Sequence, residues 1–209
     1  MPPAFGAVFL WLMATILWWS GWREEAPAEI PHWAVGVFLA IWPLAWLSEI
    51  TAIPGLTING AWCWTFITVV LLACRMNANR RWLALSTGVL IGSIYAVMSR
   101  MAFYPSGLSH YFDPWGAAIV LGWLSALLLR NVSEQALAIS AGLYLSEGIS
   151  ALLIAASGSV FEMRASEWME RWWIALLFSQ LWALTVKALI EFARKWIPKI
   201  GTRRGGQRL

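Results

Sequence analysis

The stretch AGLYLSEGISALLIAA, residues 141–156, is apolar or small at almost every position, yet it carries Glu147 near its middle. It belongs to an apolar segment over 135–157, which is close to the roughly 20 residues that an α-helix needs to cross about 30 Å of hydrocarbon. An ionised carboxylate in the middle of such a helix costs at least about 2.5–3.5 kcal/mol. We therefore expect Glu147 to be protonated, paired or directed into a water-filled cavity.

The composition extends this interpretation to the whole chain. Of its 209 residues, 60% are hydrophobic and 12% are charged, whereas a soluble domain carries about 25% charged residues. The 17 tryptophans are an excess, and tryptophan favours the boundary between hydrocarbon and water. These features predict an integral membrane protein that crosses the bilayer several times.

Seven apolar segments follow one another along the chain. Each has about the length of a membrane-spanning helix, and an open strand in lipid would leave its backbone groups without hydrogen-bond partners. The first segment lacks the basic residues and the cleavage site of a signal peptide, so we expect it to be retained. The sequence therefore predicts an all-α transmembrane bundle of about seven helices over residues 1–193, with a basic cytoplasmic tail over 194–209. The segments run over approximately 4–22, 32–50, 57–74, 82–102, 114–130, 135–157 and 170–191.

Lysine and arginine predict the orientation of this bundle. With the N-terminus outside, the inner segments hold 11 of the 15 basic residues and the outer segments hold three. Because inner loops are enriched in Lys and Arg, this bias predicts an N-out, C-in topology. The tail either grips anionic lipid through its basic residues or only sets the topology. These tail residues are Arg194, Lys195, Lys199, Arg203, Arg204 and Arg208.

Two other polar residues are predicted to lie at the depth of Glu147. Counting along each segment from its ends brings Tyr95 and Gln180 to about the same level of the bilayer. We therefore predict a polar layer near the midplane, formed by Glu147, Tyr95 and Gln180. Two interpretations stay open. The carboxyl group either holds packed helices together through hydrogen bonds, or handles a proton or a ligand.

Small residues predict where helices approach each other closely. Gly88 and Gly92 form a GxxxG pattern, and Gly142, Ser146 and Ser150 repeat at intervals of four residues on one helix face. Such faces let two helix backbones come together in lipid. We expect packing within the bundle rather than a dimer interface.

Several residues predict local geometry. Pro43 lies inside the second segment, where it leaves the carbonyl of Leu39 without its helical donor and favours a kink. Asn59 precedes the third segment and can cap it. On the outer side, residues 159–173 predict an interfacial helix with tryptophan anchors, and the loop 103–114 is either a mouth for a small ligand or a packed turn.

The sequence contains no catalytic constellation. His32 and His110 are predicted on opposite sides of the membrane, and the motifs of zinc proteases, P-loop proteins and serine hydrolases are missing. Cys63 and Cys74 share a helix face but lie about 16 Å apart, too far for a disulfide. We therefore expect no enzymatic activity, no metal and no cofactor.

Lys187 is the basic residue inside the last segment. It lies four residues before Glu191, which predicts a local ion pair. A lysine in a seventh helix also raises the question of a retinal Schiff base. We reject that interpretation because Lys187 lies near the membrane edge and the third segment carries no carboxylate counter-ion.

Three short sequences resemble a known family. INGAW at 58–62, GSIY at 92–95 and the Asp113-Pro114 pair are similar to the YphA-like family of small bacterial multi-pass membrane proteins. The resemblance implies a bacterial cytoplasmic membrane and implies no functional residues.

Two functions are consistent with the sequence. The first is a non-enzymatic membrane factor that binds another membrane protein or anionic lipid, and not nucleic acid, through its inner loops and tail. The second is a small-solute or proton-coupled carrier that uses the polar layer around Glu147. A carrier needs a continuous polar path to Glu147, whereas a binding factor can be packed solid.

Overall fold

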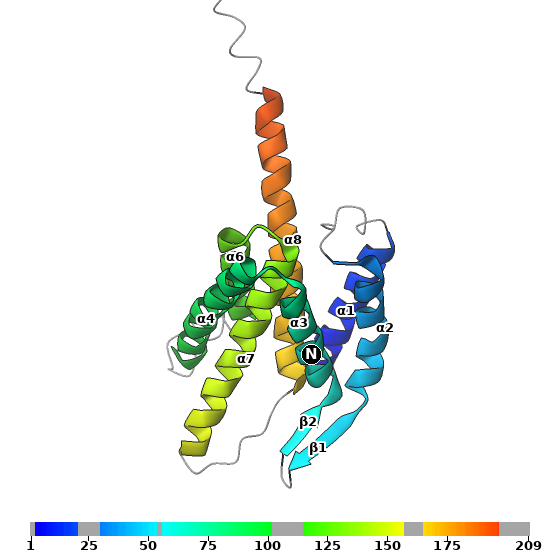
Figure 1. Ribbon diagram of the computed structural model, residues 1–209, viewed down its shortest axis with the longest axis vertical. Coiled ribbons are helices and arrows are strands. Elements are labelled where there is room, and N and C mark those ends of the chain that lie inside the picture. The colour runs from blue at the N-terminus through cyan, green and yellow to red at the C-terminus, as the bar shows by residue number, and fades with distance from the viewer. Residues whose placement is uncertain (1–2, 21–29, 54–55, 102–114, 157–164, 197–209) are drawn as a thin grey trace, which may run out of the picture.

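A computed structural model describes residues 3–20, 30–53, 56–101, 115–156 and 165–196. Within these residues the chain forms seven helices and one short hairpin, so the predicted all-α class is confirmed (Figure 1). The predicted loop 103–114 lies outside the described residues. The helices are α1 (Pro3–Trp19), α2 (His32–Trp46), α3 (Gly60–Arg75), α4 (Ala78–Met101), α6 (Trp115–Leu128), α7 (Val132–Ala156) and α8 (Ala165–Trp196).

The helices fall into two length classes. Three of them are long and apolar enough to cross a membrane, over Ala78–Ser99, Val132–Leu153 and Ser166–Arg194. The other four, α1, α2, α3 and α6, are apolar but have only 14 to 17 residues. The structure therefore supports a membrane protein, and it shortens four of the seven predicted segments.

A β-hairpin separates α2 from α3, where the sequence predicts helix up to residue 50 and again from residue 57. Strands β1 (Glu49–Ile53) and β2 (Leu56–Asn59) pair antiparallel, with Glu49 opposite Asn59. This stretch is rich in isoleucine and threonine, whose β-branched side chains favour strands. Asn59 caps α3 as predicted, because its side chain accepts a hydrogen bond of 2.9 Å from the amide of Ala61. It also donates one of 3.1 Å to the carbonyl of Trp46, which ties the two helix ends together.

The closest helix pair is α4 with α7, which meet along glycine. A Cβ atom added to Gly92 would lie 2.6 Å from the carbonyl oxygen of Gly142, and one added to Gly88 would lie 2.8 Å from that of Ala138. The two backbones are therefore in direct contact, as small residues allow in lipid. Of the two serines predicted on the same face as Gly142, Ser146 is buried, and Ser150 is half-buried.

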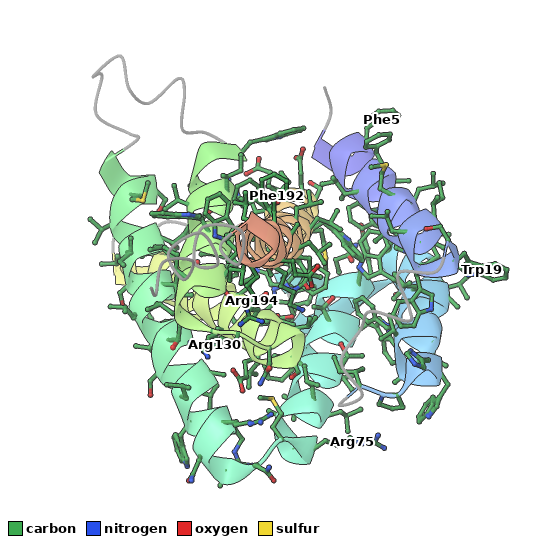
Figure 2. All side chains as sticks on the ribbon, turned by 90° about the horizontal axis from the view of Figure 1, so that it is seen from above. Phe5, Trp19, Arg75, Arg130, Phe192 and Arg194 are labelled. Atoms are coloured by element: carbon green, nitrogen blue, oxygen red, sulfur yellow. The ribbon has the colours of Figure 1, made fainter. Side chains whose placement is uncertain are left out.

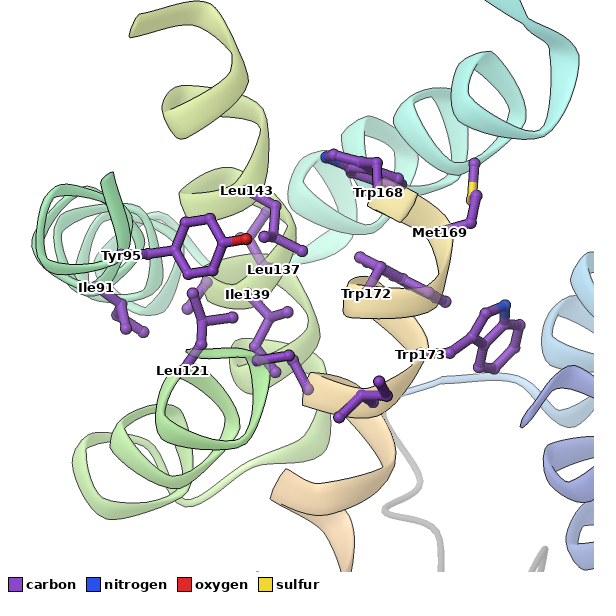
Figure 3. Close-up of a cluster of buried hydrophobic side chains, with 14 of the residues drawn as sticks. Ile91, Tyr95, Leu121, Leu137, Ile139, Leu143, Trp168, Met169, Trp172 and Trp173 are labelled. Atoms are coloured by element: carbon purple, nitrogen blue, oxygen red, sulfur yellow. The ribbon is translucent and has the colours of Figure 1, made fainter. Parts of the chain in front are cut away.

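The first half of α8 forms the centre of the molecule. Trp168, Met169, Trp172 and Trp173 are buried and face the neighbouring helices (Figure 3). The prediction over 159–173 is wrong in two respects for its described part: residues from Ala165 onward belong to one longer helix, and their tryptophans are buried between helices instead of serving as exposed anchors. Tryptophan prefers interfaces when a helix faces lipid, but here its large ring fills the space between helices.

The second half of α8 leaves the bundle. Residues 185–194, which we call the α8 extension, are exposed and continue beyond the other helices (Figure 1). Figure 2 looks along this extension; in this view Arg130 lies near it and Arg75 lies farther out. We call this the arginine end of the bundle, and the opposite end, which carries the hairpin and the start of α8, the hairpin end. Because α8 runs to Trp196, the predicted boundary between residues 193 and 194 falls inside a helix.

Candidate functional site

Glu147 lies on α7 and faces the first turns of α8. Its carboxylate is half-buried and interacts electrostatically with the guanidinium of Arg171 and the carboxylate of Glu167. Arg171 in turn forms an ion pair of 3.2 Å with Glu167, one turn earlier on α8. Gly148, next to Glu147, is exposed, and a Cβ atom there would meet nothing within 4 Å. The structure therefore places Glu147 at the edge of the bundle, within electrostatic reach of Arg171 and Glu167.

A second carboxylate of this region was not singled out from the sequence. Glu170 is only 6% exposed and accepts a hydrogen bond of 3.1 Å from the indole Nε1 of Trp115 on α6. Its carboxyl group also packs against Gly6 on α1, where any side chain would collide with it. Glu170 thus joins α1, α6 and α8. The sequence shows Glu170 as a charged residue between tryptophans. Because the stretch was predicted to lie at the membrane surface, a charged residue was expected there and its burial was not predicted.

Gln180 does not lie beside Glu147. Its Nε2 donates a hydrogen bond of 3.0 Å to Oε1 of Gln135, whose own Nε2 donates one of 2.9 Å to the carbonyl of Leu129. Gln135 precedes Glu147 by 12 residues on α7, which is about 18 Å along the helix. The depth count for Gln180 started at residue 170, but α8 starts at Ala165, so the count placed it too near the hairpin end.

Tyr95, the other predicted partner of Glu147, belongs to the apolar core. It is buried on α4 in the same cluster as Leu121 of α6 and Leu143 of α7 (Figure 3). Leu143 is one turn from Glu147. Because Tyr95 lies at the level of Leu143, it is nearer to Glu147 along α7 than Gln180 is. The structure therefore divides the predicted layer, with Gln180 at another level of the bundle.

The arginine end carries its own polar cluster. Glu134 is buried there, accepts a hydrogen bond of 2.9 Å from the side chain of Asn131 and lies 3.7 Å from Nε of Arg80. With Gln135 and Gln180, these residues connect the start of α7 to α4 and α8.

The space between the two polar clusters is packed with apolar side chains. On α7 the fully buried Ala138, Ile139 and Leu143 separate Gln135 from Glu147. Beside them Trp172 donates a hydrogen bond of 2.9 Å to Ser140, the polar side chain of this stretch that reaches α8. The space beside α7, between the two polar clusters, is therefore filled with side chains and does not form a channel in the described structure.

The predicted basic tail is described only at its start. Arg194 is exposed at the end of the α8 extension, and Lys195 belongs to the last turn of the same helix. Lys187 and Glu191 are both exposed, and no ion pair joins them in the described structure, so that prediction is wrong. The rest of the tail, Lys199, Arg203, Arg204 and Arg208, lies outside the described residues.

Metal ligands are not grouped in the described part of the chain. No cluster of three or more histidine, cysteine, aspartate or glutamate residues with metal-binding geometry is found among the residues described. Cys63 is half-buried and Cys74 is exposed, both as free thiols.

The chain matches no protein-family model, no curated protein and no solved structure. The resemblance to the YphA-like family therefore stays a prediction. Function has to be inferred from the residues of this chain, and three features stand out: the Glu147 cluster, the arginine-end cluster and the exposed α8 extension.

Proposed function

We propose that this protein is a non-enzymatic, multi-pass factor of a bacterial cytoplasmic membrane that binds a protein or lipid partner at its arginine end. The observation that carries the proposal is the exposure of apolar side chains on the α8 extension, where Leu189 and Phe192 are each 61% exposed. This surface continues past the ends of the other helices (Figure 1), and we therefore assign it to a partner instead of to the hydrocarbon that surrounds the bundle.

The α8 extension has two chemically different sides. One side of the helix is an apolar stripe with helical spacing, formed by Val186, Leu189 and Ile190. Another side carries the charged residues Lys187, Glu191 and Arg194. An amphipathic helix of this kind lies on a lipid surface or in the groove of a partner protein. The positive charges of the following tail favour an anionic partner.

The proposed orientation is N-out and C-in, with all seven helices crossing the membrane. The bias of Lys and Arg toward the inner segments supports it. In this orientation the arginine end faces the cytoplasm, together with the α8 extension. The resemblance to the YphA-like family supports the same bacterial membrane.

A carrier centred on Glu147 is the second candidate function. It is favoured by the position of an ionisable carboxylate beside Arg171 within a candidate membrane span. The apolar side chains packed beside α7 between Glu147 and Gln135 count against a carrier function, because a carrier needs a path that reaches its binding site.

Site-specific photocrosslinking of the full-length protein in native membranes tests the proposal. We would place a photoreactive amino acid at Leu189 or Phe192, and as a control at Val89, an exposed apolar position in the middle of α4. The proposal expects a discrete protein or phospholipid adduct at the first two positions and only bulk-lipid adducts at Val89. Identical adducts at all three positions would contradict it.

A further inference from the structure

The apolar length of α3 is bounded at both ends. It has 16 residues, so it is about 24 Å long. At one end Arg75 closes the helix, and at the other the hairpin begins directly at its cap residue Asn59. Between these limits α3 exposes Phe66, Val70 and Leu71, a surface suited to hydrocarbon.

The hairpin itself cannot lie in the hydrocarbon. Two strands paired only with each other leave the outer backbone groups of both strands without internal partners. In lipid each such group costs several kcal/mol, so open sheet edges stay outside the hydrocarbon layer. The exposed carboxylate of Glu49 at the start of β1 agrees with this position. The hairpin therefore marks one boundary of the bilayer.

Helix α6 gives a second, independent measure. Its described part has 14 residues, about 21 Å, and exposes Leu127 and Leu128 close to its end. Arg130 follows at the arginine end, and the exposed Trp115 stands at the other end. Exposed tryptophans also stand at helix ends on the arginine side, where such side chains anchor a helix to the interface. These are Trp19, Trp33 and Trp82.

We propose that the lipid-facing belt of this protein fits a thin hydrocarbon layer, about 21–24 Å across, and hence lipids with short acyl chains. A typical bilayer has a hydrocarbon thickness of about 30 Å, so the difference is large enough to select among lipids. The inference rests on the proposed crossing of the membrane by α3 and α6. The longer α4 and α7 continue past this layer toward the hairpin end.

A thin layer also explains two features of the site. Measured from Glu134 at the arginine end, Glu147 lies 13 residues along α7, about 20 Å, which is near the opposite boundary instead of the midplane. Its attraction to Arg171, in the first turns of α8, then takes place close to water. On the arginine side, the thin layer ends before the α8 extension, whose apolar stripe is left for a partner.

The first test reconstitutes the full-length protein in phosphatidylcholine vesicles whose monounsaturated chains have about 14, 18 or 22 carbons. Thermal unfolding is followed by tryptophan fluorescence. We expect the midpoint to be highest in the shortest chains and to fall by several degrees in the longest. A maximum in the longest chains, or no dependence on chain length, overturns the inference. Extraction with alkaline carbonate separates this result from a wrong topology, since a protein that does not span the bilayer is released.

The second test measures depth directly. Single cysteines replace Gly148 or Val89 in a protein whose native cysteines are alanine, and a membrane-impermeant maleimide is added. Both positions are exposed in the structure, and Val89 lies midway along α4. A thin layer predicts at least about tenfold faster labelling of Gly148→Cys than of Val89→Cys. Equal protection of both cysteines would place Gly148 deep in the hydrocarbon and overturn the inference.

Discussion

The indole Nε1 of Trp11 on α1 donates a hydrogen bond of 2.9 Å to the carbonyl oxygen of Leu39 on α2. This carbonyl is the one that Pro43 leaves without a helical donor, because proline has no backbone N–H. The Trp11 ring also stacks on Trp42, with 6.1 Å between ring centroids. The carbonyl group that lacks a donor in α2 is thus hydrogen-bonded by a side chain of α1, and this contact fixes how α1 packs against α2.

This relationship predicts a specific coupling between Trp11 and Pro43. Trp11→Phe keeps an aromatic ring but removes the donor, so we expect a loss of about 1–3 kcal/mol in the free energy of unfolding. In a Pro43→Ala background the alanine N–H can serve the Leu39 carbonyl, and the same substitution should cost clearly less. Reversible unfolding in detergent for the four proteins of this double-mutant cycle measures the difference. Trp19→Phe, at a side chain that is 86% exposed, is the matched control. Equal losses in both backgrounds would show that the contribution of Trp11 does not depend on the carbonyl that Pro43 leaves without a donor.

The glycine contact between α4 and α7 predicts a sharp difference among glycines. Gly92→Ala would place its methyl group against the carbonyl of Gly142, so we expect a loss of about 1–3 kcal/mol in stability. Gly36→Ala on α2 is the control, because a Cβ atom there meets nothing within 4 Å. That substitution should be neutral or stabilising by up to about 1 kcal/mol, since alanine is the better helix former. The thermal midpoints of the two variants in the same detergent decide the matter, and similar midpoints would mean that the backbones separate easily.

The general architecture was predictable from the sequence for a simple reason. Apolar runs of helical length leave few options in lipid, so the helices of the described residues and the packing of Gly88 and Gly92 against α7 follow from local pattern. The limits of the short helices did not follow, because residues 49–53 and 56–59 are apolar enough to resemble helix, and only their pairing with each other shows that they are strands.

The composition of the site was much less predictable. Depth counting requires the true helix starts, and an error of five residues at the start of α8 was enough to misplace Gln180 relative to Glu147. The burial of Trp168 and Trp173 depends on which helices surround α8, which no local pattern specifies. Glu170 was missed for the same reason, since its partners Trp115 and Gly6 are distant in sequence.

The glutamine pair at the arginine end predicts an asymmetric response to mutation. Gln135→Leu leaves the Leu129 carbonyl and the Gln180 side chain without their partner, so we expect a loss of about 1–3 kcal/mol. Adding Gln180→Leu removes one of the two orphaned groups and brings an apolar contact, and should restore part of the loss. Denaturation of the two single variants and the double variant gives the coupling energy. Strictly additive losses would mean that the two side chains act separately.

The charges around Glu147 yield the prediction that separates its structural role from a transport role. Arg171→Gln removes the cation that faces Glu147 and is paired with Glu167, so two carboxylates remain close together without compensation. Because the pair is partly exposed, we expect this variant to lose about 1 kcal/mol of stability. Glu147→Gln introduced into it should recover a large part, because it removes one of the repelling charges. Glu147→Gln alone should fold and bind its partner at the α8 extension as the unchanged protein does. Loss of photocrosslinking at Leu189 in that single variant would instead connect Glu147 to function across the length of α7, and the carrier interpretation would gain.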